Sequence, residues 1–161
     1  TYTREEFIEL IEKMKRIIPN VALSTDIIVG FPTETYNEFL DTKSVCLDVK
    51  FDHAFIFKYS ERPNTRAALK FDDDVSAKEK TKRIVELIEI QKHNSLEMNQ
   101  KWVNKKQEIL IETIKKNKNE IIGRNDANVL VYCNNLTSEK VGDLINVNIM
   151  SATPHGLKAT K

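Results

Sequence analysis

The sequence predicts an α/β part, made of the last strands and helices of a larger parallel barrel, followed by a small antiparallel β-barrel. Helices and strands alternate over the first hundred residues, which is typical of a parallel sheet with covering helices. From about Asn104 the spacing of apolar residues changes to two, the period of a strand with one buried face. We therefore expect one domain over residues 1–103 and a second over residues 104–161.

Three helices are expected from one repeated start signal, in which a Ser or Thr is followed three residues later by Glu. The first helix is stopped by Pro19 and the second extends to about Lys50. The third is a long connecting helix over residues 77–102. The three capping boxes are Thr3 with Glu6, Thr35 with Glu38, and Ser76 with Glu79.

Two strands are expected between the helices, over residues 21–30 and 53–60, and their connections imply a parallel pair. Two strands alone would leave two open sheet edges and little core, which natural domains avoid. The chain also begins with Thr1 rather than Met. We therefore expect it to be a fragment of a longer protein, with the earlier barrel strands in preceding polypeptide.

The second domain contains four or five short strands in fewer than sixty residues, separated by turn-rich links such as "KKNKN" and "VGD". A set of short strands of this kind is typical of a small closed barrel with an OB-like architecture. The expected strands are residues 107–113, 119–126, 128–134 and 144–152.

The charges, the apolar runs and the cysteines of the sequence limit which class of protein it can be. The net charge is +1, but residues 1–103 carry 16 basic and 18 acidic side chains, and residues 104–161 carry 9 and 6. A basic second domain suggests a partner of its own. No apolar run is long enough for a membrane helix, and two isolated cysteines, expected to be reduced, suit a cytoplasmic protein. Cys46 and Cys133 are predicted to be buried reduced thiols, and neither they nor the three histidines have metal-ligand spacing.

Polar residues follow both predicted strands of the first domain. "TDIIVGFPTET" (25–35) places Asp26, Gly30 and Glu34 at or beyond the first strand end, and "FKYSERPNTRAA" (57–68) follows the second. Functional groups of parallel barrels lie at this edge, and an arginine there could bind a carboxylate or phosphate. Two simpler interpretations remain open: a well-capped strand-to-helix turn, and a solvated loop with ion pairs of Glu61.

Basic side chains are frequent in the second domain, where few aromatic residues are available for base stacking. Small β-barrels often bind nucleic acid through a charged face, here by contacts to the backbone. The alternative is an ordinary solvated surface. The basic residues are Lys105, Lys106, Lys115, Lys116, Lys118, Arg124 and Lys140, and His155 lies in a turn of the same domain.

Together, "STDIIVGFPTET", "FKYSERPNTRAA" and a basic barrel with Gly123-Arg124 and Asn128 resemble one family in the same order over the whole chain. The sequence resembles the C-terminal part of radical-SAM tRNA methylthiotransferases, nearest to the branch that modifies N6-isopentenyladenosine beside the anticodon. The resemblance implies the end of a radical-SAM partial barrel followed by a TRAM domain, an RNA-binding β-barrel.

The resemblance also implies roles for individual residues. Gly30-Phe31-Pro32-Thr33-Glu34-Thr35 stands where the family has Gly-Phe-Pro-Gly-Glu-Thr, so we expect Thr33 to reach a positive φ less easily than glycine. Asn64 replaces another glycine and tolerates that conformation. Residues implied to face S-adenosylmethionine are Ile28, Gly30, Glu34, Tyr59, Ser60 and Arg62. Residues implied to contact tRNA are Lys105, Lys106, Lys115, Lys116, Lys118, Arg124, Asn128 and His155.

The intact enzyme of this family uses S-adenosylmethionine and two [4Fe–4S] clusters to add a methylthio group to C2 of the adenine. Each cluster needs three cysteines, and two isolated cysteines cannot supply them. The resemblance therefore implies that this chain alone is inactive and contributes cofactor positioning and docking of the tRNA anticodon stem-loop. It implies a monomer when intact, and it leaves the sulfur donor unidentified.

Two other functions remain open on the sequence. The chain could be a stand-alone RNA-binding module with a helical appendage. It could also be part of a different barrel enzyme, with a phosphate or carboxylate substrate near Gly30 and Arg62.

Overall fold

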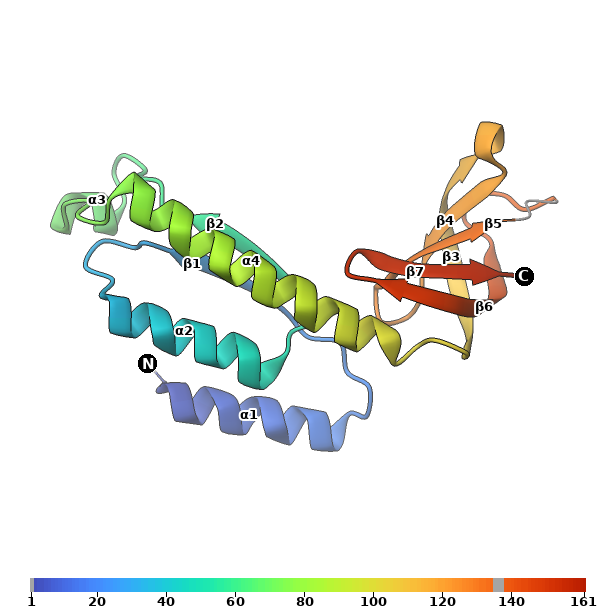
Figure 1. Cartoon of the computed structure of the whole chain (residues 1–161), viewed down its shortest axis with the longest axis horizontal. Helices are drawn as coiled ribbons and strands as arrows, with labels where there is room; N and C mark the ends of the chain where they lie inside the picture. The colour runs from blue at the N-terminus through green and yellow to red at the C-terminus, as the bar shows by residue number, and fades with distance from the viewer. Residues whose placement is uncertain (1, 135–137) are drawn as a thin grey trace. The chain divides into compact units, whose positions relative to one another are not determined.

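A computed structural model describes residues 2–134 and 138–161 of the chain (Figure 1). They group into two units. One contains the N-terminal helix up to Ile17 together with Leu23–Gln91, and the other contains Lys92–Lys161 with the short segment Ile18–Ala22. The division falls within the long helix α4 (Ala77–Gln100), and the domain boundary at residues 103 and 104 stays a prediction.

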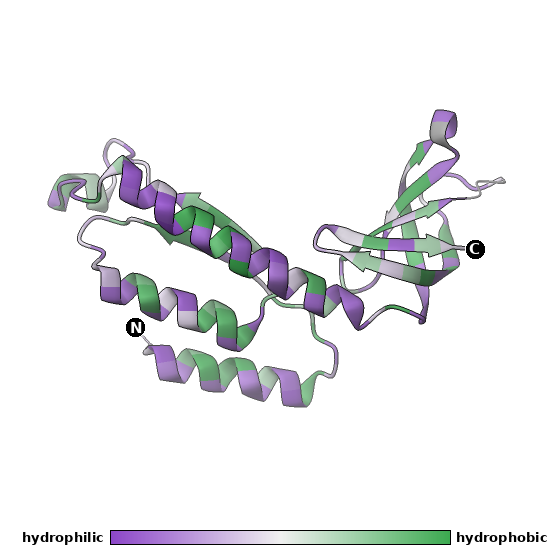
Figure 2. Ribbon diagram, viewed as in Figure 1, coloured by the Kyte–Doolittle hydropathy of each residue, from purple (hydrophilic) through white to green (hydrophobic). Residues whose placement is uncertain are grey.

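Helices α1 (Arg4–Ile17) and α2 (Tyr36–Val49) begin where the capping boxes predict. The hydroxyl of Thr3 accepts a hydrogen bond from the backbone N–H of Glu6 at 3.2 Å, and the Glu6 carboxylate accepts one from the backbone N–H of Thr3 at 2.7 Å. Thr35 caps α2 in the same reciprocal way. Figure 2 shows hydrophobic and hydrophilic residues alternating along both helices.

The first unit is built on two parallel strands, β1 (Ser24–Val29) and β2 (His53–Lys58). One face of this pair is covered by α2 and by the first part of α4, whose apolar side chains follow a helical spacing. A short helix, α3 (Arg66–Lys70), follows β2 and was not expected from the sequence. The buried core consists of Val29, Phe39, Cys46 and Leu87, with Ile27, Ile56, Ile84 and Ile90 packed around it.

The opposite face of the two strands is open within the described residues. Ile28 and Phe57, which are cross-strand partners, are 54% and 52% exposed, and Phe55 is 60% exposed beside Asp26. Parallel sheets are normally covered on both faces, because their connections place helices over them. A two-stranded pair with one open apolar face agrees with the expectation that it belongs to a larger barrel.

The second unit contains a closed five-stranded barrel with the order β3–β4–β5–β7–β6, in which only β5 and β7 run parallel. Ten buried side chains, from Ile109 to Ala159, fill its interior. Gly123 is required for closure, because a Cβ there would lie 2.3 Å from the carbonyl oxygen of Leu110. The elements are β3 (Lys106–Lys115), the 3₁₀ turn η1 (Lys116–Lys118), β4 (Glu120–Arg124), β5 (Leu130–Asn134), β6 (Leu144–Thr153) and β7 (Gly156–Thr160).

The predicted order of an α/β part followed by an all-β barrel is confirmed. The main addition is β7, which is short and pairs with both β5 and β6, so it closes the barrel. Among the described residues, no helix has the length and apolar character needed to cross a membrane.

Candidate functional site

The ends of β1 and β2 meet at one edge of the sheet. The backbone N–H of Tyr59, just after β2, donates to the carbonyl oxygen of Val29, the last residue of β1, at 2.8 Å. Gly30 then turns with φ +67°, a conformation that glycine adopts without steric cost. The predicted site residues Gly30, Glu34 and Tyr59 therefore come from two loops that leave neighbouring strands at the same edge.

Glu34 is held inside this edge by hydrogen bonds. Its Oε2 atom accepts the backbone N–H of Gly30 at 2.5 Å and an N–H of Arg83 at 2.6 Å. The side chains of Glu34 and Arg83 are only 12% and 6% exposed. The carboxylate is thus engaged with protein groups, which makes Glu34 a residue that shapes the loop after β1.

Arg83, in the second turn of α4, joins three acceptors. Beyond the Glu34 carboxylate, it donates to the backbone carbonyl of Glu34 at 3.0 Å and, through Nε, to Glu79 at 3.1 Å. Burial would lower the pKa of Arg83, but the hydrogen bonds to both glutamates outweigh it and raise that pKa above its usual value. The guanidinium is therefore a fixed positive charge beneath the loop.

Lys80, one turn before Arg83, ties the second loop to the same helix. Its Nζ lies 2.5 and 2.6 Å from the two carboxylate oxygens of Asp73 and 5.1 Å from the centre of the Tyr59 ring. Its side chain is buried, and its methylene groups pack against Gly30. We call Gly30, Glu34, Tyr59, Asp73, Lys80 and Arg83 the strand-end cluster.

Aromatic rings lie at the surface of the strand-end cluster. The ring of Phe31 packs edge-on against Tyr59, with centroids 5.2 Å apart, and lies 6.5 Å from Phe71. Phe31 and Phe71 are both exposed. The hydroxyl of Tyr59 is buried and has no hydrogen-bond partner among the described residues. This edge therefore offers apolar contact area and one unsatisfied polar group.

The remaining predicted residues of the first unit lie apart from the cluster. Ile28 stands on the open face of the sheet. Ser60 and Arg62 are exposed, and within the described part of the chain their side chains form no hydrogen bond or ion pair. The carbonyl oxygen of Arg62 accepts the hydroxyl of Thr65, which caps α3. The structure thus brings together three of the six predicted residues.

Thr33 has a positive φ in this loop. Its φ is +73°, in a region that the sequence predicts threonine to reach less easily than glycine, and its backbone N–H donates to Asp74 at 2.8 Å. Phe31 and Glu34 hold the turn in the same conformation, since the N–H of Glu34 donates to the carbonyl of Phe31 at 2.9 Å. The surrounding hydrogen bonds therefore outweigh the steric preference of threonine. Asn64 has φ +66°, as expected.

Sequence reasoning missed Lys80 and Arg83. Both precede Ile84 and Leu87 at a helical spacing, so they occupy the buried stripe of α4 at its start. Charged residues at positions predicted to be buried require partners. Two charged residues in a stripe predicted to be buried, together with a strand end rich in polar groups, were the features of the sequence that could have identified Lys80 and Arg83.

In the barrel, the predicted RNA-binding residues fall at separate places. Lys106 begins β3 and Lys105 directly precedes it, while Lys115 ends the strand and Lys116 begins η1. Lys115 pairs with Glu120 at 3.4 Å. His155 is exposed in the turn between β6 and β7. The side chain of Lys118 lies outside the described part. These positions therefore form a generally basic surface rather than one cluster.

One hollow of the barrel does bring two predicted residues together. Lys106 from β3 and Arg124 from β4 line it with the buried side chain of Asn125. Arg124 is held by Glu112 at 3.2 Å and donates to the carbonyl oxygen of the predicted Asn128 at 2.9 Å. The other lining residues are Gln107, Glu108, Leu110, Asp126 and Leu144. We call these eight lining residues the barrel hollow.

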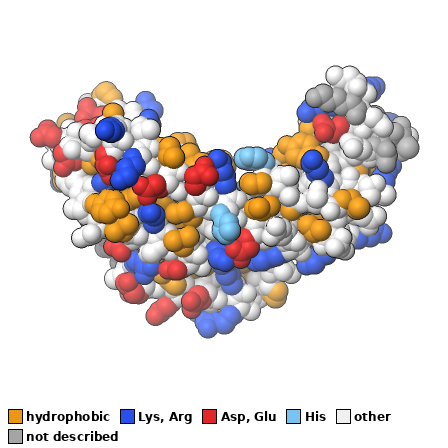
Figure 3. Space-filling view, viewed as in Figure 1, with side chains coloured by type: hydrophobic (Ala, Val, Ile, Leu, Met, Phe, Trp, Pro, Cys, Tyr) orange, Lys and Arg blue, Asp and Glu red, His pale blue; other side chains and the backbone are white. Residues whose placement is uncertain are grey.

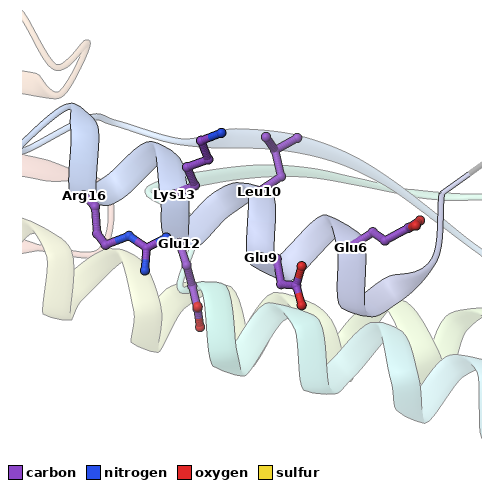
Figure 4. A pocket seen from close by; sticks show the side chains of 6 residues that line it. All are labelled: Glu6, Glu9, Leu10, Glu12, Lys13 and Arg16. Carbon is purple, nitrogen blue, oxygen red and sulfur yellow. The ribbon is translucent and has the colours of Figure 1, made fainter.

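A second hollow, on α1, is a weak candidate for a site. Figure 4 shows that all its lining side chains come from this one helix, with Leu10 among three carboxylates and two cations. On the face in Figure 3, hydrophobic, basic and acidic side chains are likewise interspersed. Mixed charges on one helix are typical of a solvated surface.

The described residues contain no set of ligands for a metal ion, because no three His, Cys, Asp or Glu side chains among them converge. Neither cysteine forms a disulfide, and both are buried, as predicted. Burial raises the pKa of Cys46 to about 11, and burial also raises the pKa of Cys133, although the charge of Lys161 opposes it. Both side chains are therefore thiols at neutral pH, whereas metal ligands are thiolates.

Comparisons with known proteins agree with this architecture. The sequence model of the TRAM domain matches residues 100–161. The chain is 42% identical over 159 residues to a tRNA-2-methylthio-N(6)-dimethylallyladenosine synthase of Sulfurihydrogenibium sp. (strain YO3AOP1), covering 99% of this chain and 36% of the relative. Proteins of the same name from Flavobacterium johnsoniae and Clostridium botulinum (strain Hall) are 38% and 42% identical, over 98% and 97% of this chain.

The match covers nearly all of this chain but only part of each relative. The chain spans about a third of the length of the curated relatives it matches. Both the α/β unit and the barrel fall within the matched region. The chain is therefore a homologue of the C-terminal part of tRNA-2-methylthio-N(6)-dimethylallyladenosine synthases, and it ends in a TRAM domain.

Proposed function

We propose that this chain is the C-terminal part of a radical-SAM enzyme that adds a methylthio group to C2 of N6-isopentenyladenosine beside the anticodon of tRNA. The observation that carries the proposal is the identity of about 40% across 97–99% of the chain to proteins with that named activity. The match runs through both units, so it includes the strand-end cluster as well as the RNA-binding type of domain.

The residues present fit S-adenosylmethionine in two respects. Ile28 and Phe57 offer exposed apolar surface on the open sheet face, and the buried hydroxyl of Tyr59 lacks a partner in the described part of the chain. When bound, the cofactor would supply the methyl group and the adenosyl radical. In this proposal Ile28, Gly30 and Tyr59 contact the cofactor, Ser60 and Arg62 face it, and Glu34 fixes the loop that does so.

The described residues do not fit an iron–sulfur cluster. Such clusters are held by sets of cysteine thiolates, whereas the two cysteines here are buried in separate units as thiols. Cluster ligands would therefore have to come from other polypeptide. We propose that this chain alone does not catalyse the reaction, and that it acts within the longer cytoplasmic, monomeric enzyme.

For the barrel we propose docking of the tRNA anticodon stem-loop. Lysine and arginine side chains neutralise phosphates, and backbone contacts position an RNA without needing aromatic side chains. The predicted contacts are Lys105, Lys106, Lys115, Lys116, Lys118, Arg124, Asn128 and His155. Because the barrel closes on its own core, a stand-alone RNA-binding module is the second candidate function.

The deciding experiment uses the intact protein that contains this chain, purified anaerobically with its clusters reconstituted. It is incubated with S-adenosylmethionine, a sulfide source and tRNA that carries N6-isopentenyladenosine, and the digested nucleosides are analysed by mass spectrometry. We expect a product heavier by one methylthio group, and none with tRNA that lacks the isopentenyl group. Tight tRNA binding without any product, under conditions in which a known synthase reacts, would favour the stand-alone binding function.

A further inference from the structure

We infer that Lys80 and Arg83, at the start of α4, are positioning residues that set the conformation of the Gly30–Glu34 loop for cofactor binding. The part of this inference that concerns cofactor binding by the loop rests on the proposed function. Its structural content, that two buried cations of one helix hold the loops after both strands, depends only on the described contacts.

Arg83 determines where the carboxylate of Glu34 lies. The Oε2 atom of Glu34 accepts two hydrogen bonds, one from the Gly30 N–H at 2.5 Å and one from the Arg83 guanidinium at 2.6 Å. Arg83 also holds the backbone carbonyl of Glu34 at 3.0 Å. The guanidinium thus fixes both ends of the turn, because one end is the Gly30 amide and the other is the Glu34 backbone.

Lys80 determines how closely Gly30 approaches the helix. A Cβ on Gly30 would lie 2.4 Å from Cγ of Lys80, so the missing side chain of Gly30 is replaced by the lysine stem. The ammonium group continues past Gly30 to Asp73 and lies 3.5 Å from the backbone carbonyl of Tyr59. Lys80 therefore connects the loop after β1 with the loop after β2.

A purely stabilising role would not require these charges. Burying an ion pair costs desolvation energy that well-packed apolar side chains avoid, so buried pairs are weak sources of stability. Here Arg83 and Lys80 reach the backbone carbonyls of Glu34 and Tyr59, and the carboxylate that Arg83 holds accepts the Gly30 N–H. Apolar side chains could not make these contacts. The arrangement is suited to fixing one loop geometry, as expected of groups that support a binding site.

The matched control is the ion pair of Lys43 with Glu86, at 2.8 Å, which joins α2 to the same helix α4. Its side chains are more exposed than those of Lys80 and Arg83. The Lys43 ammonium contacts Glu86 and lies over the ring of Phe39, a ring that the Arg83 guanidinium also contacts from 5.4 Å. Among the described residues, the pair has no hydrogen bond or ion pair to either loop. Removing Lys43 therefore perturbs the packing of α2 on α4 while leaving every hydrogen bond and ion pair of the strand-end cluster in place.

The test compares Arg83→Met, Lys80→Met and Lys43→Met in the intact protein. The first readout is hydrogen exchange of the Gly30 amide. We expect exchange at least about tenfold faster in Arg83→Met, which releases the Glu34 carboxylate that accepts this amide, and in Lys80→Met, which removes the ammonium contacts that join the two loops. We expect no change in Lys43→Met. The second readout is the dissociation constant of S-adenosylmethionine by calorimetry, expected to rise at least about tenfold in the first two variants only.

Conservative variants separate positioning from folding. Lys80→Arg keeps the cation and its stem, so we expect it to restore near-normal exchange and binding. Equal changes in melting temperature for all three methionine variants, with Gly30 exchange the same in each, would overturn the inference. If the wild-type protein binds no S-adenosylmethionine but Gly30 exchange follows the expected order, the positioning role stands and the proposed function fails.

Discussion

Ile28 on β1 lies directly opposite Phe57 on β2, and both side chains are more than half exposed on the sheet face that the described helices leave open. Phe55 extends this apolar surface by one step along β2. Parallel strands are normally buried on both faces. The relationship therefore identifies the face on which a complete barrel would place its interior.

The open face makes a first prediction for the isolated 161-residue chain. Replacing Phe55 and Phe57 together by Thr keeps residues that favour strands but removes exposed apolar area. We expect less binding of a hydrophobic dye and less aggregation, with a change in the free energy of unfolding within about 1 kcal/mol, as for exposed positions. Dye fluorescence and light scattering provide the measurement. Unchanged dye binding would show that this face is covered in solution.

The loop after β1 makes a second prediction through its backbone. Thr33 has φ +73°, and a left-handed conformation costs a non-glycine residue about 1–2 kcal/mol. Its partner Asp74 is contacted by the backbone N–H, which glycine retains. Thr33→Gly should therefore stabilise the first unit by roughly 1 kcal/mol, less the extra chain entropy of glycine.

The control for Thr33→Gly is Asn64→Gly, at φ +66° in another exposed loop. Asparagine tolerates this conformation better than threonine, so its replacement should gain less. Urea unfolding followed by circular dichroism measures both. An equal gain for the two variants would mean that Thr33 is not strained more than Asn64.

The start of α2 makes a third prediction. The hydroxyl of Thr35 accepts the N–H of Glu38, and the Glu38 carboxylate accepts the N–H of Thr35. The Thr35 hydroxyl also donates to this carboxylate at 2.7 Å, and the two hydrogen bonds that the carboxylate accepts, the backbone one foremost, lower the pKa of Glu38. Thr35→Ala should cost about 1 kcal/mol in the free energy of unfolding, the typical loss for an N-cap.

Thr42→Ala serves as the comparison for Thr35→Ala, because the Thr42 hydroxyl bonds the carbonyl of Glu38 inside α2 and satisfies no terminal N–H. Alanine favours a helix interior more than threonine does. We expect this variant to be as stable as the wild type or slightly more so. A loss equal to that of Thr35→Ala would argue against a capping role.

Cys46 makes a fourth prediction about pH. Burial raises its pKa to about 11 from an ordinary value of 9.0. Because the folded-state pKa lies above the unfolded one, the stabilising contribution is complete below pH 9 and is lost as pH rises toward 11. In urea unfolding between pH 8 and pH 10.5, Cys46→Ala should lose less stability than the wild type over this range. Parallel curves for the two proteins would contradict the burial of the thiol.

The sequence anticipated the elements that have strong local signals. Capping boxes and helical spacing located α1, α2 and α4, since each signal lies within a few residues. The five-residue helix α3 and the strand β7 were not anticipated, because short elements depend on tertiary contacts such as the pairing of β7 with β5 and β6. Periodicity identifies long elements better than short ones.

The sequence predicted part of the candidate site but not the residues of α4 that hold its loop in place. Gly30 and Glu34 are visible in the sequence as a strand end, but Arg83 lies 49 residues after Glu34, and nothing local links the two. Their contact follows from the packing of α4 on the strands. Likewise, Thr33 violates a local preference because hydrogen bonds from elsewhere in the fold hold it.

The barrel hollow makes the fifth prediction, which tests RNA docking. Lys106→Ala and Arg124→Ala each remove a cation from one concave surface, and each should weaken tRNA binding and reduce the salt dependence of log K by about 0.7–0.9. Lys158→Ala, on the exposed side of β7, has the same change of charge without facing this hollow and is the control. Fluorescence anisotropy with labelled tRNA at several salt concentrations measures the slopes. Equal slopes for all three variants would mean that the tRNA senses only net charge, whereas a reduced slope for Lys106→Ala and Arg124→Ala alone would locate its phosphates at the barrel hollow.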